Sequence, residues 1–306
     1  KKISFDDEIT TSKYAASMGG SQVYLEVGES LSLKDMFKSI AIASANDASV
    51  AVAEHIAGSI NKFVEMMNDK AKKLGLKNTH FKNATGLHDP DHYTCAHDLA
   101  IMAAYLIEIG GEDLFAVTSL YDSYIREDTK QSFWLVNTNK LLNLYNGVDG
   151  LKTGYTKEAG YCLVTTAQRD GQRIIGVLMK ETAPKTRNEE MCSLLDYGFN
   201  NYKQVTIFKK DTLIEQHLVD KMDNLTIDVK CKKDIVYTKA KSADAKVSTK
   251  VNYKENFLPV KQGDVIGTLD VIVDGKTIAT YDVYSDTNAS KSTYLSKTIK
   301  TLKYLF

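Results

Sequence analysis

Apolar side chains recur every three or four positions over four stretches of the first 110 residues, a spacing typical of helices with one buried face. The spacing predicts helices over residues 33–43, 48–57, 59–74 and 95–109. Gly58 separates the second helix from the third, because glycine is a poor helix former. The same helical spacing returns once more at residues 185–202.

A different pattern, runs of Val, Ile and Leu separated by turn residues, marks the strands. Residues 161–166 and 173–179 form two such runs, and Asp170-Gly171 between them is a strong hairpin signal. From residue 203 to about residue 284 no long helical period is found, and short β-branched runs alternate with lysine-rich turns. Asp274-Gly275 lies between two of these runs and predicts a second hairpin.

These elements predict an α+β protein in which helices pack on an antiparallel sheet, followed by a smaller all-β domain. The predicted boundaries are residues 1–202 for the first domain, 203–285 for the second and 286–306 for a C-terminal tail. In the tail, an apolar stripe at helical spacing is formed by Leu295, Ile299, Leu302 and Phe306. A basic amphipathic segment of this kind can lie on a membrane surface, and packing on the β-domain or a frayed end is the alternative.

The composition is that of an ordinary soluble globular protein, with 43% hydrophobic and 25% charged residues among 306. The 39 basic residues balance the 39 acidic ones, so the chain lacks the positive charge of a nucleic-acid-binding protein. Four widely spaced cysteines form no Cys-x-x-Cys pair, which argues against a zinc site or a disulfide scaffold. No secretion-signal pattern follows Lys1, so we expect any such signal to have been removed or to lie outside this sequence.

Two short motifs stand out as candidates for chemistry: Ser44-Ala45-Asn46, after the first helix, and Lys152-Thr153-Gly154, on a predicted edge strand. By chance a Ser-x-Asn is expected about once in a chain of this length, and a Lys-Thr-Gly roughly 0.1 times. A second Ser-x-Asn at Ser59 is interpreted as a helix N-cap, and Ser44 alone would be a cap or turn residue. Together and in this order, the motifs are typical of serine acyl-transfer enzymes of the penicillin-binding type.

The chain resembles the D-alanyl-D-alanine carboxypeptidases, the low-molecular-weight penicillin-binding proteins, nearly from end to end. Four segments carry the resemblance: ASANDA at 43–48, LGLKNTHF at 74–81, TGL at 85–87 and VDGLKTGYT at 148–156. Gly160-Tyr161 and the helix that starts near Lys185 also fit the family pattern. The resemblance implies a β-lactamase/transpeptidase-like catalytic domain, then a β-rich domain and an amphipathic anchor.

The resemblance also implies roles for particular residues. It makes Ser44 and Lys152 proton-relay groups and Asn46 the side chain that orients the substrate amide, and it places Thr153, Gly154, Tyr155 and Arg187 in the substrate-binding site. Arg187 is one of only four arginines, against 35 lysines, and a guanidinium can grip a carboxylate with two parallel hydrogen bonds. The alternative for Arg187 is a solvated helix residue.

The implied activity is a serine-type carboxypeptidase that removes the terminal D-alanine from peptidoglycan stem peptides through an acyl-enzyme, without metal or cofactor. Its implied partners are stem peptides ending in D-Ala-D-Ala and, as inhibitors, β-lactams. It would act in cell-wall synthesis and cell shape, outside the cytoplasm and peripherally on the membrane. A non-catalytic peptidoglycan-binding relative and, with less support, a β-lactamase are the alternatives.

One expected motif, the Ser-x-x-Lys of the nucleophile, is missing ahead of Ser44. Ser59-Ile60-Asn61-Lys62 has the right letters but follows Ser44, in reversed order. Thr10-Thr11-Ser12-Lys13 begins only 34 positions before Ser44 and lies among polar residues. We therefore expect the nucleophile upstream of Lys1.

Histidines cluster in the sequence beside three aspartates, which raises the question of a metal site. The residues are His80, His88, His92, His97, Asp89, Asp91 and Asp98. They show no His-x-x-x-His or similar ligand spacing on one helix face, so surface and turn roles are predicted and no metal is expected. Cys162, inside a predicted strand, is interpreted as a small core residue.

Overall fold

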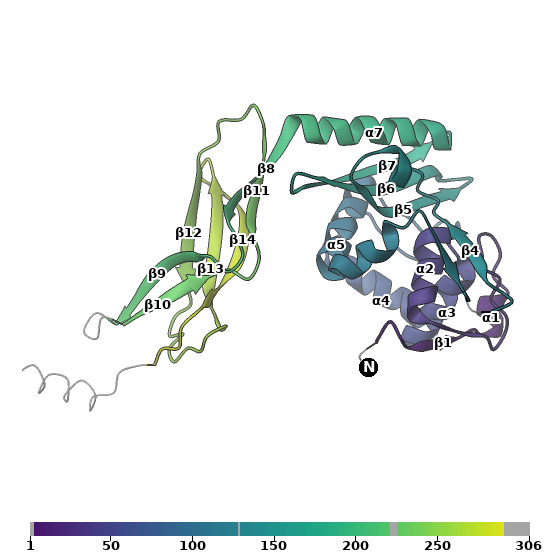
Figure 1. The fold of residues 1–306 in the computed structure, drawn as a ribbon, viewed down its shortest axis with the longest axis horizontal. Coiled ribbons are helices and arrows are strands. Elements are labelled where there is room, and N and C mark those ends of the chain that lie inside the picture. Colours follow the sequence, from purple (N-terminus) through teal and green to yellow (C-terminus); the bar gives the residue numbers. More distant parts are fainter. Residues whose placement is uncertain (1–2, 128, 221–224, 291–306) are drawn as a thin grey trace, which may run out of the picture. The chain divides into compact units, whose positions relative to one another are not determined.

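Figure 1 shows the computed structural model, which describes residues 3–127, 129–220 and 225–290. The chain divides into two structural units, residues 1–199 and residues 200–306. The predicted tail at 286–306 lies largely outside the described residues, as do the four residues of its apolar stripe.

Four helices of the first unit confirm the helical pattern of the sequence. They are α2 (Leu33–Ala43), α3 (Asn46–Ala57), α4 (Ile60–Lys73) and α5 (Ala96–Thr118). Ser59 caps α4 by accepting a hydrogen bond from the Lys62 N–H, as interpreted from the sequence. Helix α5 runs further than predicted: it passes a kink at Gly111 and continues because Leu114 and Val117 still point into the core. The two consecutive glycines bend the helix there but do not end it.

A three-stranded antiparallel sheet lies against these helices. Its strands are β5 (Val148–Thr156), β6 (Gly160–Arg169) and β7 (Gln172–Glu181), in the order β5-β6-β7. Asp170 and Gly171 both have positive φ, as the predicted hairpin between β6 and β7 requires. Strand β5 is at the edge of the sheet, as predicted for the Lys-Thr-Gly motif.

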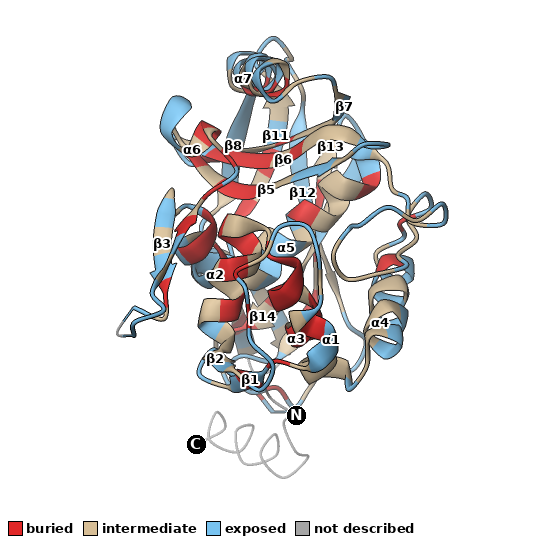
Figure 2. Ribbon diagram, turned by 90° about the vertical axis from the view of Figure 1, so that its right-hand side faces the viewer, coloured by how far each residue is buried: buried red, intermediate tan, exposed pale blue. Residues whose placement is uncertain are grey.

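Both faces of the sheet are covered by helices. Helix α7 (Pro184–Asn201) packs Met191 and Leu195 against Leu163 of β6. On the other face, α5 packs Leu114 against Leu151 of β5. Figure 2 shows α7 above the sheet, α5 and α2 below it, and buried residues along β5 and β6.

Shorter elements complete the first unit. They are β1 (Glu8–Thr10), α1 (Lys13–Ala16), β2 (Ser30–Ser32), β3 (Asp122–Ile125), β4 (Phe133–Val136) and α6 (Leu141–Leu144). Strand β1 pairs with β2, and β3 pairs with β4. Ile9, Ile125 and Leu135 from these strands pack with Met36 and Ile42 of α2. This core fixes the end of α2, where Ser44 follows.

The second unit is all-β in its described part, as predicted. Its strands are β8 (Tyr202–Phe208), β9 (Leu213–Asp220), β10 (Leu225–Lys230), β11 (Ile235–Ala240), β12 (Val247–Tyr253), β13 (Val265–Val273) and β14 (Lys276–Ser285). One sheet has the order β12-β13-β14-β10-β9, and β8 pairs with β11. Asp274-Gly275 forms the predicted turn, again with positive φ at both residues.

Among the described residues, no helix combines the length and the apolar character that crossing a membrane requires.

Candidate active site

The Ser44 hydroxyl and the Lys152 ammonium meet in the structure. Ser44 ends α2 in the left-handed conformation, with φ of 61°, which turns the chain into α3 at once. Lys152 Nζ, from the edge strand β5, donates hydrogen bonds of 2.9 Å to Ser44 Oγ and to the Thr153 carbonyl oxygen. The two motifs therefore meet at this contact, although Ser44 ends a helix and does not begin one.

The surroundings of Lys152 favour its neutral form more than water does. Burial, and secondarily the positive charge of Arg187, lower the pKa of Lys152 to about 8. A lysine with this pKa is still mostly protonated at pH 7 but can give up a proton at small cost. Together with the bonded Ser44 hydroxyl, it forms a pair that can pass a proton.

Asn46, the other residue of the first motif, is buried and held by a glycine-rich loop. Its side-chain Nδ2 donates to the Gly19 carbonyl oxygen at 2.8 Å, and its backbone N–H donates to Ser21 at 2.8 Å. A Cβ on Gly20 would lie only 2.8 Å from Asn46 Nδ2, and Gly20 has a φ of 81°. This close contact, which sequence reasoning missed, needs glycine at position 20.

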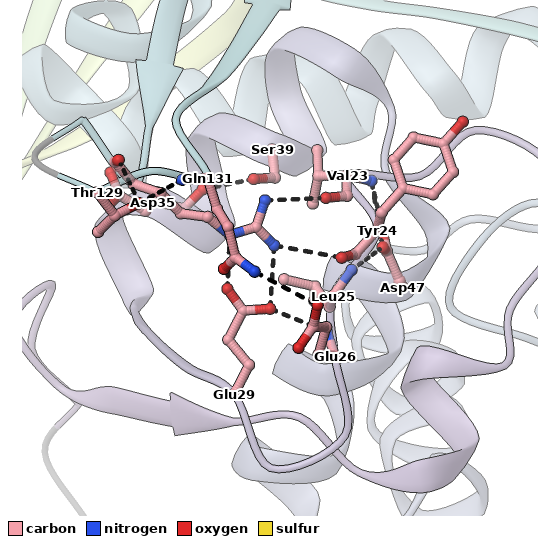
Figure 3. Close-up of polar contacts among 11 residues, drawn as sticks. Val23, Tyr24, Leu25, Glu26, Glu29, Asp35, Ser39, Asp47, Thr129 and Gln131 are labelled. Atoms are coloured by element: carbon pink, nitrogen blue, oxygen red, sulfur yellow. Dashed lines mark hydrogen bonds and ion pairs between the residues drawn. The ribbon is translucent and has the colours of Figure 1, made fainter.

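The segment that follows this loop is fastened at two points (Figure 3). The Asp47 carboxylate accepts hydrogen bonds from the N–H groups of Val23 and Leu25. Arg126 donates to both carboxylate oxygens of Glu29 and to the Val23 carbonyl oxygen. Burial by itself would raise the pKa of Glu29. The hydrogen bonds from Arg126 and from the Glu26 backbone, together with the charge of Arg126, outweigh this effect, so the pKa of Glu29 is lowered overall. In the sequence, only the small number of arginines pointed to a special role for Arg126, and nothing pointed to Glu29 as its partner.

The substrate-binding motif lies along β5. Thr153 Oγ1 donates to Thr138 Oγ1 at 2.7 Å, so its hydroxyl is fixed at the strand edge. Gly154 is exposed. Tyr155 is 60% exposed, and its ring stacks on that of Tyr161 with centroids 4.4 Å apart. These three consecutive residues thus form an open strand edge next to Lys152.

Arg187 is buried, at 5% exposure, so the alternative of a solvated helix residue is wrong. Its Nε and Nη2 donate to Asn188 Oδ1 at 3.2 and 2.9 Å. In the part of the chain that the structure describes, no carboxylate forms an ion pair with it. Burial lowers the pKa of Arg187, which nevertheless stays charged. Its positive charge helps to lower the pKa of Lys152.

Neither sequence candidate for the nucleophile is arranged as one. Ser59 Oγ accepts the Lys62 N–H at 3.4 Å as the cap of α4. In the other candidate, the Thr10 side chain at the nucleophile position hydrogen-bonds that of Ser30, with the two hydroxyl oxygens 2.9 Å apart, and Ser12 Oγ accepts the Ala15 N–H at 3.0 Å as the cap of α1. Both serines therefore have helix-capping roles.

The histidines lie in different local structures: His80 pairs with Tyr93 in an isolated β-bridge, and His97 lies at the start of α5. His80 Nδ1 lies 2.6 Å from the Asp91 carbonyl oxygen, and His92 Nδ1 accepts the Lys82 N–H. No group of three potential metal ligands is found within the described ranges. Cys162 lies in β6 as predicted, but it is half-buried and lines a cavity, so its interpretation as a core residue was wrong.

The fold and these residues define a penicillin-binding type of serine peptidase. Residues 1–183 match the model of the D-alanyl-D-alanine carboxypeptidase family, and residues 202–291 match the C-terminal domain of penicillin-binding protein 5. The chain belongs to the D-alanyl-D-alanine carboxypeptidases, and the resemblance found in the sequence is confirmed.

Individual relatives agree with this assignment. The chain is 43% identical to D-alanyl-D-alanine carboxypeptidase DacF of Bacillus subtilis over 97% of its own length and 77% of the relative's. It is similar to the structure of penicillin-binding protein 5 from Haemophilus influenzae, with a TM-score of 0.73 and 31% identity, covering 94% of this chain and 84% of that one. It is also similar to ampicillin-bound penicillin-binding protein D2 from Listeria monocytogenes, with a TM-score of 0.56 and 29% identity, covering 64% and 78%.

Proposed function

We propose that the site at Lys152 and Arg187 binds the terminal D-Ala-D-Ala of peptidoglycan stem peptides, for removal of the last D-alanine. The observation that carries this proposal is the buried Arg187 guanidinium, which has no carboxylate partner in the described part of the chain and whose charge acts on Lys152. Two cations whose charges act on each other favour an anion nearby. A free C-terminal carboxylate is such an anion, and it fits the fork of a guanidinium.

In the proposed reaction, a serine oxygen bonds to the carbonyl carbon of the penultimate residue. Ser44 and Lys152 relay the proton of that serine hydroxyl to the nitrogen of the last D-alanine, the bond between this nitrogen and the penultimate carbonyl carbon breaks, and water later cleaves the resulting ester. The Asn46 amide orients the substrate amide. The Thr153 hydroxyl receives the terminal carboxylate, and the Tyr155 N–H receives the carbonyl oxygen, where negative charge develops. Gly154 leaves room for the peptide backbone.

The serine that is acylated belongs, in this proposal, to a segment ahead of Lys1. What supports this is the capping role of Ser12 and Ser59, whose hydroxyls accept backbone N–H groups. The Ser44 hydroxyl, bonded to Lys152, then acts on the proton and not on the carbonyl carbon.

The cellular setting is also a proposal. The family resemblance and the basic, apolar-striped sequence of 286–306 support an extracytoplasmic protein held peripherally at the membrane. β-Lactams are proposed ligands of the same site, supported by the ampicillin-bound Listeria relative.

Peptide binding tests the proposed function without requiring turnover. Isothermal titration calorimetry would compare acetyl-L-Ala-D-Ala-D-Ala with the same peptide amidated at its C-terminus. We expect the free acid to bind about tenfold to hundredfold more tightly, the value of one or two charge-assisted hydrogen bonds. Equal affinity for the two peptides would show that the site at Lys152 and Arg187 does not bind a terminal carboxylate.

A further inference from the structure

The hairpin of β3 and β4 has one face buried and one face open. On the inner face, Ile125 and Leu135 are fully buried and pack in the same core as Met36 and Ile42 of α2. Because side chains alternate along a strand, the neighbouring residues of each strand point the other way. In Figure 2, β3 lies at the margin of the first unit. None of the roles given above uses the open face of this hairpin.

The open face holds two large aromatic side chains. Tyr124 and Trp134 are directly opposite each other in the register of β3 and β4, and they are 46% and 55% exposed. Opposite residues of an antiparallel pair lie on the same face, with Cβ atoms about 5 Å apart. Trp134 is the only tryptophan among 306 residues. Tryptophan is on average a well-buried residue type, and it is enriched at the centres of binding surfaces.

The Trp134 ring is held in a fixed orientation on this face. Its Nε1 donates a hydrogen bond of 3.1 Å to Asp122 Oδ2, from the strand opposite. The backbone beneath is held as well, because Lys38 of α2 donates to the Tyr124 carbonyl oxygen at 3.3 Å and pairs with Asp35. The indole and its strand are thus preorganised, which lowers the entropy lost when a ligand binds.

The polar groups of the open face decide which class of ligand fits it. Asp122 uses one carboxylate oxygen for the indole, and in the described part of the chain no donor is bonded to the other. A carboxylate repels acidic lipid headgroups and is costly to bury among acyl chains, so a membrane surface does not fit. Aromatic side chains side by side on a two-stranded ribbon form a platform, which suits a flat ligand more than a compact cation.

A pyranose ring matches both the platform and the carboxylate. Its faces present C–H groups, which are attracted to the electron-rich face of an aromatic ring. Its rim presents hydroxyl groups, which can donate to the free oxygen of Asp122. Small-molecule sites generally combine aromatic surface with a few polar groups of this kind. Sugar chains are also the part of peptidoglycan to which the stem peptides are attached.

We propose that the open face of the β3–β4 hairpin binds the sugar rings of a polysaccharide, with Trp134 and Tyr124 as the platform and Asp122 as the hydrogen-bond acceptor. In peptidoglycan, this ligand is the glycan chain. The inference goes beyond the proposed function, since the ligand is the sugar chain and not the end of the peptide. A second contact of this kind keeps the protein on the polymer between one stem peptide and the next.

The sole tryptophan makes the proposed site directly observable. Titration with tetra-N-acetylchitotetraose, a soluble N-acetylglucosamine oligomer, should change the fluorescence of Trp134 in a saturable way. Tyr124→Ala should weaken this binding about twofold to tenfold, the value of one aromatic contact. Calorimetric titration of Trp134→Ala, which needs no fluorescence, should show a loss of affinity at least as large. Circular dichroism checks that each variant is folded, as expected for substitutions of exposed side chains.

Tyr197→Ala is the matched control, because Tyr197 is 57% exposed on α7, outside the hairpin. It should bind the oligomer as tightly as the wild type. The inference is overturned if the wild type shows no saturable binding, or if Tyr124→Ala and Trp134→Ala bind as tightly as the wild type. A Trp134 response to phosphatidylglycerol vesicles or to tetralysine, without one to the oligomer, also overturns it and assigns the face to a membrane or a basic partner. Each of these results leaves the peptide site at Lys152 unaffected.

Discussion

The Lys152 ammonium lies 2.9 Å from the Ser44 hydroxyl, although 108 positions separate the two residues in the sequence. Ser44 is held by the left-handed end of α2, and Lys152 by the edge strand β5. Burial and the charge of Arg187 lower the pKa of Lys152 to about 8, so the contact joins a hydroxyl to a cation that releases its proton readily.

The lowered pKa of Lys152 should be visible in the pH dependence of stability. Between pH 8 and about 10.5 the unfolded chain binds more protons at Lys152 than the folded chain, so its contribution to the free energy of unfolding rises with pH. Below that range, holding Lys152 in its charged form lowers the free energy of unfolding by on the order of 3 kcal/mol, and the hydrogen bond to Ser44 offsets part of this loss. Urea unfolding of the wild type and Lys152→Met across pH 7 to 10.5 measures this pH dependence. If the free energies of unfolding of the two proteins changed in parallel with pH, the lowered pKa of Lys152 would be contradicted.

Arg187→Lys should weaken binding of acetyl-L-Ala-D-Ala-D-Ala about tenfold to hundredfold, because an ammonium cannot reproduce the two-pronged grip of a guanidinium. The C-terminally amidated peptide should lose little further affinity in the variant. Calorimetric titration of both peptides into both proteins gives the coupling between residue and carboxylate. Equal losses for the two peptides would mean that Arg187 supports the fold and not the carboxylate.

The chain from Lys1 to Phe306 should not gain the mass of a penicilloyl group after incubation with penicillin. Acylation needs a serine activated by a nearby base, and Ser12 and Ser59 are engaged as helix caps. Intact-mass spectrometry provides the measurement. Should an adduct form, peptide mapping of the acylated chain would locate it, and a penicilloyl group on Ser44 itself would contradict the relay role proposed here.

The Arg126–Glu29 pair should contribute measurably to stability. Glu29→Gln leaves the largely buried guanidinium without its anion and should lower the free energy of unfolding by about 1–3 kcal/mol. Because the pKa of Glu29 is lowered in the fold, this contribution is present above its ordinary value of 4.5 and disappears as the pH falls below it. Chemical unfolding at pH 7 and pH 3.5 compares the two proteins.

A matched control for that prediction is Glu189→Gln. Glu189 pairs with Lys185 on the surface of α7, where the two side chains are 65% and 86% exposed. Its loss should cost less than about 0.5 kcal/mol. Similar effects for Glu29→Gln and Glu189→Gln would show that the buried pair has no special weight.

Sequence periodicity predicted the helices and hairpins well, because local spacing and turn residues decide them. Helix α2 has the predicted bounds, and Asp170-Gly171 forms the predicted turn. The motifs also indicated that Ser44 and Lys152 belong together. Helix α5 was predicted too short because its two consecutive glycines look like an end, whereas burial of Leu114 carries the helix past them.

Contacts between distant polar residues could not be predicted in this way. Arg126 and Glu29 are 97 positions apart, and no periodicity links them. The same holds for the Gly19 carbonyl that holds Asn46, since a backbone acceptor has no sequence signature. The cavity between the loop at residues 86–94 and the β5–β6 hairpin needed the fold as well, because its two walls are far apart in the sequence.

The open edge of β5 also has a consequence for chirality. A peptide that pairs with a strand edge is bound through its main chain, and in an extended chain the side chains alternate between the two faces. Exchanging an L-residue for its mirror image moves the side chain away from the face it would otherwise take, while the main-chain donors and acceptors stay in place. The edge that contains Thr153 and Gly154 can therefore distinguish D- from L-residues through the direction of a single methyl group, without a pocket shaped around either.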